Sequence, residues 1–274
     1  MAFRTIFMAV GTADSDAEID RAVAICERAG AHLALLVIGV APPPPASPYG
    51  VVSNDIWAGE IRDGQTEAQA RAEALEARFA GSPVSVGVEA QYIDRGTIAT
   101  LAARFARYAD LTLVPPNCDV QSPVLDGALF ESGRPVLLLP TSETDFPTPK
   151  TVMIAWNASV QASKAVRSAI AVMQTAEKVH AVLIDPVPSF DGHGPEPGAD
   201  LATYLGRHGI TTEVHRLPKE GKDTGEMLRR VATDLGADLV VMGGYGHSRL
   251  RERIFGGATT SMVKTPSVAV LMAH

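Results

Sequence analysis

The amino-acid sequence predicts an α/β protein of two tandem units, each with a five-stranded, mostly parallel open sheet and helices on both faces. Two observations lead to this fold class. Short apolar segments alternate with helical segments of about 10–16 residues, which is typical of strand–helix–strand units with parallel strands. The whole series of segments then occurs a second time within the 274 residues, which indicates an internal repeat.

The repeat begins with two similar strands, RTIFMAV at 4–10 and KTVMIAW at 150–156. It is strongest in ADLTLVP at 109–115 and ADLVVMG at 237–243. The other predicted strands are 32–39, 84–94 and 134–140 in the first half and 179–185, 210–217 and 265–272 in the second. Helices are predicted at 14–29, 97–108, 160–176 and 224–235.

Apolar periodicity marks the buried faces of the first helix in each half. The predicted core positions are Ile19, Ala22, Val23 and Cys26 in one and Ala162, Ala165, Val166, Ala169 and Met173 in the other. Continuous apolar runs such as LLVI and LVVM predict strands that are covered on both faces. The polar, proline-marked stretch 141–150 predicts a linker between a first domain at 1–140 and a second at 151–274.

Composition and charge exclude several classes of protein. A hydrophobic content of 46% indicates a packed core, and no apolar run reaches the about 18–20 residues of a membrane span. The N-terminal residues become polar too early for a secretory signal. Cys26 and Cys118 are too few for a disulfide framework, so we expect a cytoplasmic protein. The net charge of −7 argues against binding to nucleic acid or to a membrane surface.

The second half is the better place for an anionic ligand. Residues 1–146 carry a net charge of −9, whereas residues 147–274 carry +2. Gly243, Gly246 and Gly256 follow a buried strand with the spacing G-x2-G-x9-G, and a helix is expected after Gly257. Glycines allow a ligand to approach the backbone, and the N–H groups and dipole of a helix N-terminus favour phosphate.

With this motif, in this strand context and within a repeat, the sequence resembles the universal stress protein family in its tandem two-domain form. The resemblance implies an adenine nucleotide alpha hydrolase-like or flavodoxin-like fold, and ATP or another adenine nucleotide bound in the second half. It also implies that the final strands of the two halves pair, and that chains form homodimers. The binding residues implied are Asn157, Leu183, Asp185, Met242, Gly243, Gly246, His247, Arg249, Gly256, Gly257, Ala258 and Thr259.

The sequence departs from the family motif at particular positions. Gly257 stands where the family has Ser or Thr, and Thr259 is expected to supply the missing hydroxyl. Asn157 stands at the end of the first strand, where the family's ATP binders have Asp, and Asp185 is expected beside the ribose. In the first half, Pro115 and Cys118 replace the first two glycines, which predicts that this half binds no phosphate in the same way.

Three functions remain open on the sequence. The first is a stress-response module that binds an adenine nucleotide without dedicated catalysis. The second is a regulatory protein of the same fold that binds no nucleotide and acts through its surfaces, and the third is a weak nucleotide hydrolase. The chain contains no nucleophile elbow, zinc signature or lysine-bearing Walker loop, so we assign no catalytic residue. We also assign no metal, apart from Mg²⁺ that could accompany the nucleotide, because Asp191, His193 and Glu196 match no strong zinc spacing.

Overall fold

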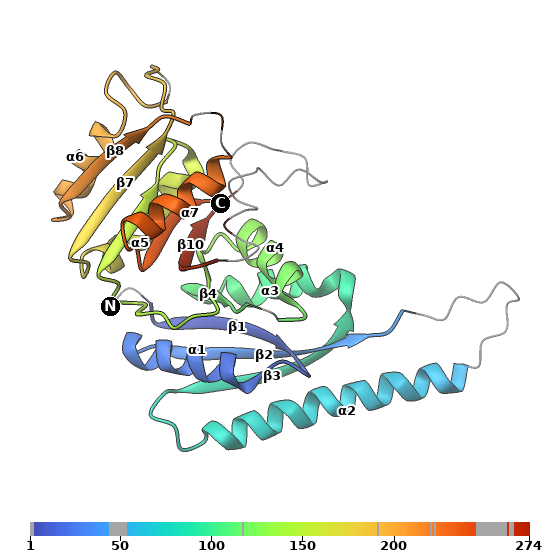
Figure 1. The fold of residues 1–274 in the computed structure, drawn as a ribbon. Helices are drawn as coiled ribbons and strands as arrows, with labels where there is room; N and C mark the ends of the chain where they lie inside the picture. The colour runs from blue at the N-terminus through green and yellow to red at the C-terminus, as the bar shows by residue number, and fades with distance from the viewer. Residues whose placement is uncertain are drawn as a thin grey trace, which may run out of the picture. The chain divides into compact units, whose positions relative to one another are not determined.

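The chain folds into two compact units, a first unit of residues 3–134 and a second unit of residues 135–274 (Figure 1). The computed structural model describes residues 3–43, 54–116, 118–190, 192–219, 221, 223–244, 262 and 266–274. Both units are built of strands that alternate with helices, so the predicted α/β class is confirmed. No helix within these described ranges is long and apolar enough to cross a membrane.

The four strands of the first unit are parallel and lie in the order β3-β2-β1-β4. Its elements are β1 (Thr5–Gly11), α1 (Asp16–Ala29), β2 (His32–Ala41), α2 (Asn54–Phe79), β3 (Val86–Asp94), a 3-10 turn (Arg95–Thr97), α3 (Ile98–Ala106), β4 (Leu111–Val114) and α4 (Gln121–Glu131). β1 and β4 are buried along nearly their whole length, as their continuous apolar runs predicted.

The second unit has six strands in the order β5-β10-β9-β6-β7-β8. All of its strand pairs are parallel except β5–β10. Its elements are β5 (Val136–Leu138), β6 (Thr151–Ala155), α5 (Val160–Met173), β7 (Lys178–Ile184), α6 (Ala199–Arg207), β8 (Thr212–Leu217), α7 (Thr224–Asp234), β9 (Leu239–Gly243) and β10 (Ala269–Ala273).

The prediction of five strands in each unit is wrong, because the first unit has four strands and the second has six. β5, the final strand of the first half, belongs to the second unit because it pairs antiparallel with β10, with Leu138 opposite Val270. All three residues of β5 and all five of β10 are buried, so each strand covers an apolar edge of the other. The expected pairing of the two final strands is therefore confirmed, while dimerisation between chains stays a prediction.

Local signals in the sequence fix the ends of the helices. Ser15 and Ser159 act as N-caps of α1 and α5 through their hydroxyl oxygens, as we expected for Ser159. All five predicted core residues of α5 are buried, but Val23 of α1 is only half-buried. Helices α2, α4 and α6 were not predicted, and α2 lies against β2 and β3 (Figure 1).

The aspartates of the two ADL segments have the same structural role in both units. The carboxylate of Asp110 accepts hydrogen bonds from the backbone N–H groups of Arg4 and Thr5, at 2.7 and 3.0 Å. The carboxylate of Asp238 accepts from Lys150 and Thr151, both at 2.9 Å. Each aspartate also donates its own N–H to the carbonyl of the threonine. These contacts hold the starts of β1 and β4, and of β6 and β9, in register.

We expect Asp110→Ala and Asp238→Ala each to lower the free energy of unfolding of its own unit by about 1–3 kcal/mol, because two N–H groups lose a charged acceptor. Urea denaturation gives the size of the loss, and hydrogen exchange shows which unit is affected. Asp234→Ala is the control, since Asp234 is exposed and only pairs with Arg230 at 3.6 Å. An effect no larger than that of the control would contradict the proposed role.

Candidate functional site

The carboxyl ends of β6, β7 and β9 form the predicted ligand edge of the second unit. From β6 the chain runs outward to β7 and β8, and then returns to β9 on the other side of β6. The sheet therefore changes direction between β6 and β9, and open α/β sheets bind ligands at such switch points. Asn157, Asp185 and Gly243 lie at or just after the ends of these three strands.

Asn157 is exposed and belongs to the turn that starts α5. Its Oδ1 accepts hydrogen bonds from the N–H of Ser159 at 3.2 Å and from the Ser159 hydroxyl at 2.7 Å. The hydroxyl oxygen of Ser159 in turn accepts from the N–H of Ala162 at 3.1 Å. The side-chain oxygen of Asn157 is thus bound within the turn. The side-chain amide nitrogen of Asn157 is the group that can bind a ligand.

Asp185 is exposed immediately after β7 and has a left-handed backbone with φ of 50°. Its N–H donates to the carbonyl of Leu217 at 2.7 Å, which ties this turn to the end of β8. Aspartate tolerates a positive φ better than most residues do. The turn therefore places a carboxylate beyond the strand end, beside the position of Asn157 on the neighbouring strand.

Leu183 and Met242 offer only their backbones to a ligand at this edge. Leu183 is fully buried, and Met242 is 5% exposed. Met242 and Val182 both pair with Ala155, so Met242 and Leu183 point to opposite faces of the sheet. Contact between the backbone near Leu183 and a ligand stays a prediction.

Gly243 has a packing role that the sequence did not show. A Cβ atom at this position would lie 2.5 Å from the backbone nitrogen of Ala162 and 2.8 Å from the carbonyl carbon of Gln161. The end of β9 can therefore approach the first turn of α5 only because residue 243 is a glycine. The other predicted loop residues, Gly246, His247, Arg249, Gly256, Gly257, Ala258 and Thr259, lie outside the described residues.

At the matching place in the first unit, a carboxylate of the protein itself lies between β1 and β4. Asp14 Oδ2 accepts from the N–H of Gly11 at 2.6 Å and from the thiol of Cys118 at 2.8 Å. Asp14 Oδ1 accepts from the N–H of Asp119 at 3.2 Å. An internal anion thus binds donors from both sides of this switch point, where an anionic ligand would otherwise be placed.

The length of the turn before α1 is a sequence signal for Asp14. Thr5 and Thr151 are equivalent, since each binds the aspartate of an ADL segment. The helix cap Ser15 comes ten positions after Thr5, whereas Ser159 comes eight positions after Thr151. The first unit therefore has two extra residues in this region, and the longer turn carries Asp14.

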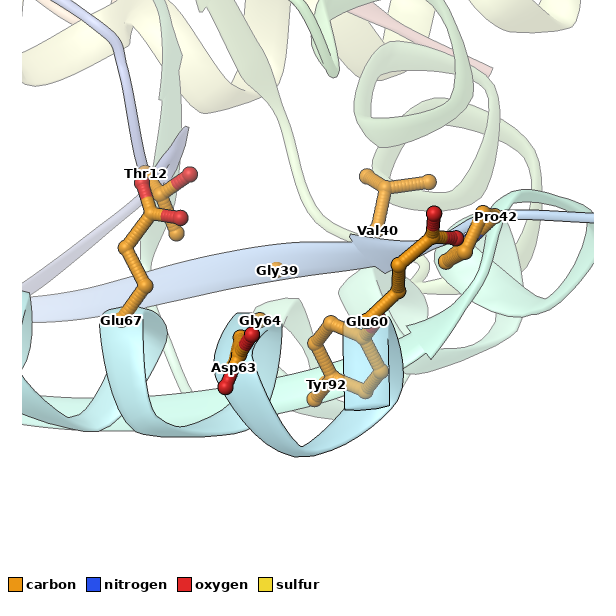
Figure 2. Close-up of a pocket in the computed structure, with 9 residues that line it drawn as sticks. All are labelled: Thr12, Gly39, Val40, Pro42, Glu60, Asp63, Gly64, Glu67 and Tyr92. Atoms are coloured by element: carbon orange, nitrogen blue, oxygen red, sulfur yellow. The ribbon is translucent and has the colours of Figure 1, made fainter. Parts of the chain in front are cut away.

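The first unit also has a pocket of about 330 Å³ between α2 and the strand ends (Figure 2). Tyr92 forms one wall and fits against Gly39 and Gly64, where a Cβ would come within 2.7 and 2.5 Å of its ring. Burial and the charge of Glu60 both raise the pKa of Tyr92. The described residues that line the pocket are Thr12, Gly39, Val40, Pro42, Glu60, Asp63, Gly64, Glu67 and Tyr92. Three of these residues are acidic and none is basic, so they disfavour a phosphate.

Comparison with known proteins gives a family match for the second half of the chain. Residues 148–274 match the model of the Universal stress protein family. A universal stress protein from Archaeoglobus fulgidus DSM 4304 has a similar structure, with a TM-score of 0.70 and 14% identity over 97% of this chain and 95% of that chain. A putative universal stress protein from Pseudomonas aeruginosa UCBPP-PA14 gives a TM-score of 0.62 and 16% identity, over 98% and 92% of the two chains. At these identities the solved structures show the fold alone, and no curated protein matches the chain.

We expect Asp14→Ala to make Cys118 more reactive towards alkylation at pH 8. Burial, the hydrogen bond to Asp14 and its charge raise the pKa of the Cys118 thiol to about 12, and the last two causes disappear in the variant. Each unit by which the pKa falls increases the thiolate fraction about tenfold. Mass spectrometry of iodoacetamide-treated protein measures the rate.

Cys26 is the internal control for this experiment, because burial alone raises its pKa to about 12 and its side chain is fully buried in α1. An unchanged rate at Cys118 would show that Asp14 does not hold the thiol. A matching increase at Cys26 would indicate unfolding instead.

Proposed function

Because residues 148–274 belong to the universal stress protein family, we propose that this chain is a tandem universal stress protein whose second unit binds an adenine nucleotide, ATP or AMP. The binding site in this proposal is the edge formed by the ends of β6, β7 and β9. Asp185 and Asn157 would face the adenosine, and the glycine segment that starts at Gly243 would face the phosphates.

The contrast between the two switch points is the observation that carries this proposal. In the first unit the carboxylate of Asp14 accepts the N–H groups of Gly11 and Asp119. In the second unit the turn between β6 and α5 contains Trp156, Asn157 and Ala158, and none of them is acidic. A negative charge at the first switch point repels phosphate, whereas the second has no such charge in this turn.

Charge and polar groups near the site support the same assignment. Residues 147–274 carry a net charge of +2 and all the lysines of the chain. Asp185 extends past the end of β7 with a backbone that its bond to Leu217 holds in place. A ribose offers hydroxyl donors to a carboxylate in this position.

In this proposal the protein acts in the stress response without dedicated catalysis. It would act in the cytoplasm, where the free cysteines Cys26 and Cys118 stay reduced. Homodimerisation belongs to the same proposal. Among the described strand ends, Asn157 is bound within its own turn and Asp185 is exposed to solvent, which is a poor setting for a general base. The protein would therefore respond to a nucleotide by binding it.

We expect Gly246→Val to abolish ATP binding, because its side chain would enter the phosphate loop, and Gly257→Ser to strengthen binding about tenfold. The added hydroxyl restores the residue type of the family motif, and a hydrogen bond to a charged oxygen contributes about 1.5–3 kcal/mol before ordering costs. Equilibrium dialysis with labelled ATP measures both changes.

Gly206→Val is the matched control, since Gly206 lies in α6 of the same unit and a Cβ there meets no atom within 4 Å. It should bind ATP as the wild type does. If the wild type binds no nucleotide and Gly257→Ser restores no binding, the nucleotide proposal fails. The function that then remains is that of a regulatory protein that acts through its surfaces.

A further inference from the structure

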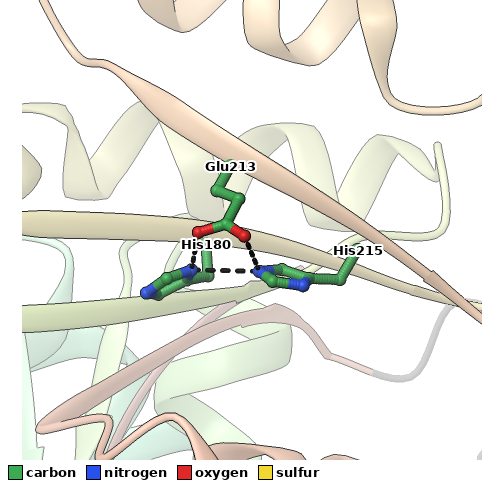
Figure 3. Close-up of side chains that lie close together, drawn as sticks. All are labelled: His180, Glu213 and His215. Carbon is green, nitrogen blue, oxygen red and sulfur yellow. Dashed lines mark hydrogen bonds and ion pairs between the residues drawn. The ribbon is translucent and has the colours of Figure 1, made fainter.

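Two histidines and a glutamate lie together on one face of the second unit (Figure 3). His180 is in β7, and Glu213 and His215 are in β8, the last strand in the order of the sheet. His180 pairs with Glu213 in the parallel register, and His215 follows Glu213 by two positions. Because side chains alternate along a strand, all three point to the same face.

This face is the one opposite α6. Ala181 pairs with Val214 and lies on the other side of β7 from His180. Gly198, which precedes α6, would direct a Cβ to within 2.7 Å of Val214 and 3.3 Å of Leu183. The start of α6 therefore packs on the Val214 side, and the cluster of His180, Glu213 and His215 lies on the other.

The three side chains already have the separations that one metal ion requires. His180 Nδ1 lies 3.0 Å from His215 Nε2. The two oxygens of Glu213 lie 3.4 Å from His180 Nδ1 and 3.6 Å from His215 Nε2. Ligands bound at about 2.0–2.2 Å in a tetrahedral site are about 3.2–3.6 Å apart, so these side chains need only small movements to share an ion.

Without an ion, the two rings share a hydrogen bond in which one nitrogen donates and the other accepts. Burial, His215 and Lys178 lower the pKa of His180, and Glu213 opposes this shift. His180 is 7% exposed, whereas Glu213 is exposed. The cluster thus has one buried and one solvent-facing side, which leaves a coordination position open to water.

We propose that His180, Glu213 and His215 form a binding site for a divalent transition-metal ion of the zinc type. Two imidazoles and one carboxylate favour Zn²⁺, Co²⁺, Ni²⁺ or Cu²⁺ over Mg²⁺ and Ca²⁺, which prefer oxygen ligands. His180 would bind through Nδ1 and His215 through Nε2. The ion would connect the last strand of the sheet to β7 through side chains, in addition to the backbone ladder.

The site is independent of the proposed nucleotide site. His180 is near the amino end of β7, and Asp185 follows its carboxyl end. His180 and Asp185 are separated along the strand by about 16 Å, and His215, which pairs with Val182, lies about 10 Å before Asp185, at about 3.3 Å per residue. Loss of nucleotide binding would leave this proposal intact, and loss of the metal would leave the nucleotide site intact.

Isothermal titration of the full chain, stripped with a chelator and free of any affinity tag, tests the proposal with Zn²⁺ as the probe. We expect one Zn²⁺ per chain, and an affinity reduced tenfold or more in both Glu213→Gln and His215→Ala. Glu213→Gln is the milder change, because the residue is exposed and keeps its shape. Mg²⁺ in place of Zn²⁺ should give no binding at this site.

His208→Ala is the matched control, because this histidine of the second unit follows α6 and its ring contacts Tyr204. It should bind Zn²⁺ as the wild type does, and circular dichroism should show all variants folded. No Zn²⁺ bound by the wild type would overturn the proposal. So would binding that survives in both Glu213→Gln and His215→Ala, or that His208→Ala weakens equally.

Discussion

The bonds between an aspartate carboxylate and the start of the neighbouring strand are the constraint on which both units depend. Asp110 and Asp238 each bind two N–H groups at the beginning of β1 or β6. They set the registers that place Ile6 opposite Leu111 and Val152 opposite Leu239. These registers determine where the four strands end, and the switch point of each sheet lies between those ends. An interaction at the amino ends therefore positions the proposed ligand edge at the opposite side of the sheet.

The two units have this frame in common and differ at the edge that it positions. In the first, a longer turn brings Asp14 against the N–H groups of Gly11 and Asp119, and acidic residues of α2 line the nearby pocket. In the second, Asn157 and Asp185 end neighbouring strands, and Gly243 allows β9 to approach the start of α5. The two units therefore differ at their switch points: the first binds its own strand ends through Asp14, and the proposed nucleotide site is in the second.

Hydrophobic patterns predicted the strands and their parallel order, because burial on both faces leaves continuous apolar runs such as those of β2 and β9. They did not predict α2, whose 26 residues are rich in charged residues and alanine and have only a weak apolar stripe. Asn157 and Asp185 were predicted from the resemblance to the universal stress protein family, at positions that follow strands. Asp14 and the cluster of His180, Glu213 and His215 were missed because they depend on contacts between distant residues. His180 and His215 are 35 positions apart, and only the register of β7 and β8 brings them together.

The central claim is that one of two similar units binds an adenine nucleotide while a carboxylate of the protein fills the equivalent place in the other. The number of nucleotides bound per chain tests this claim most directly. Native mass spectrometry of the full chain, titrated with ATP to saturation, should show one nucleotide per chain. Two nucleotides per chain would contradict the role given to Asp14, and none would contradict the site at the ends of β6, β7 and β9.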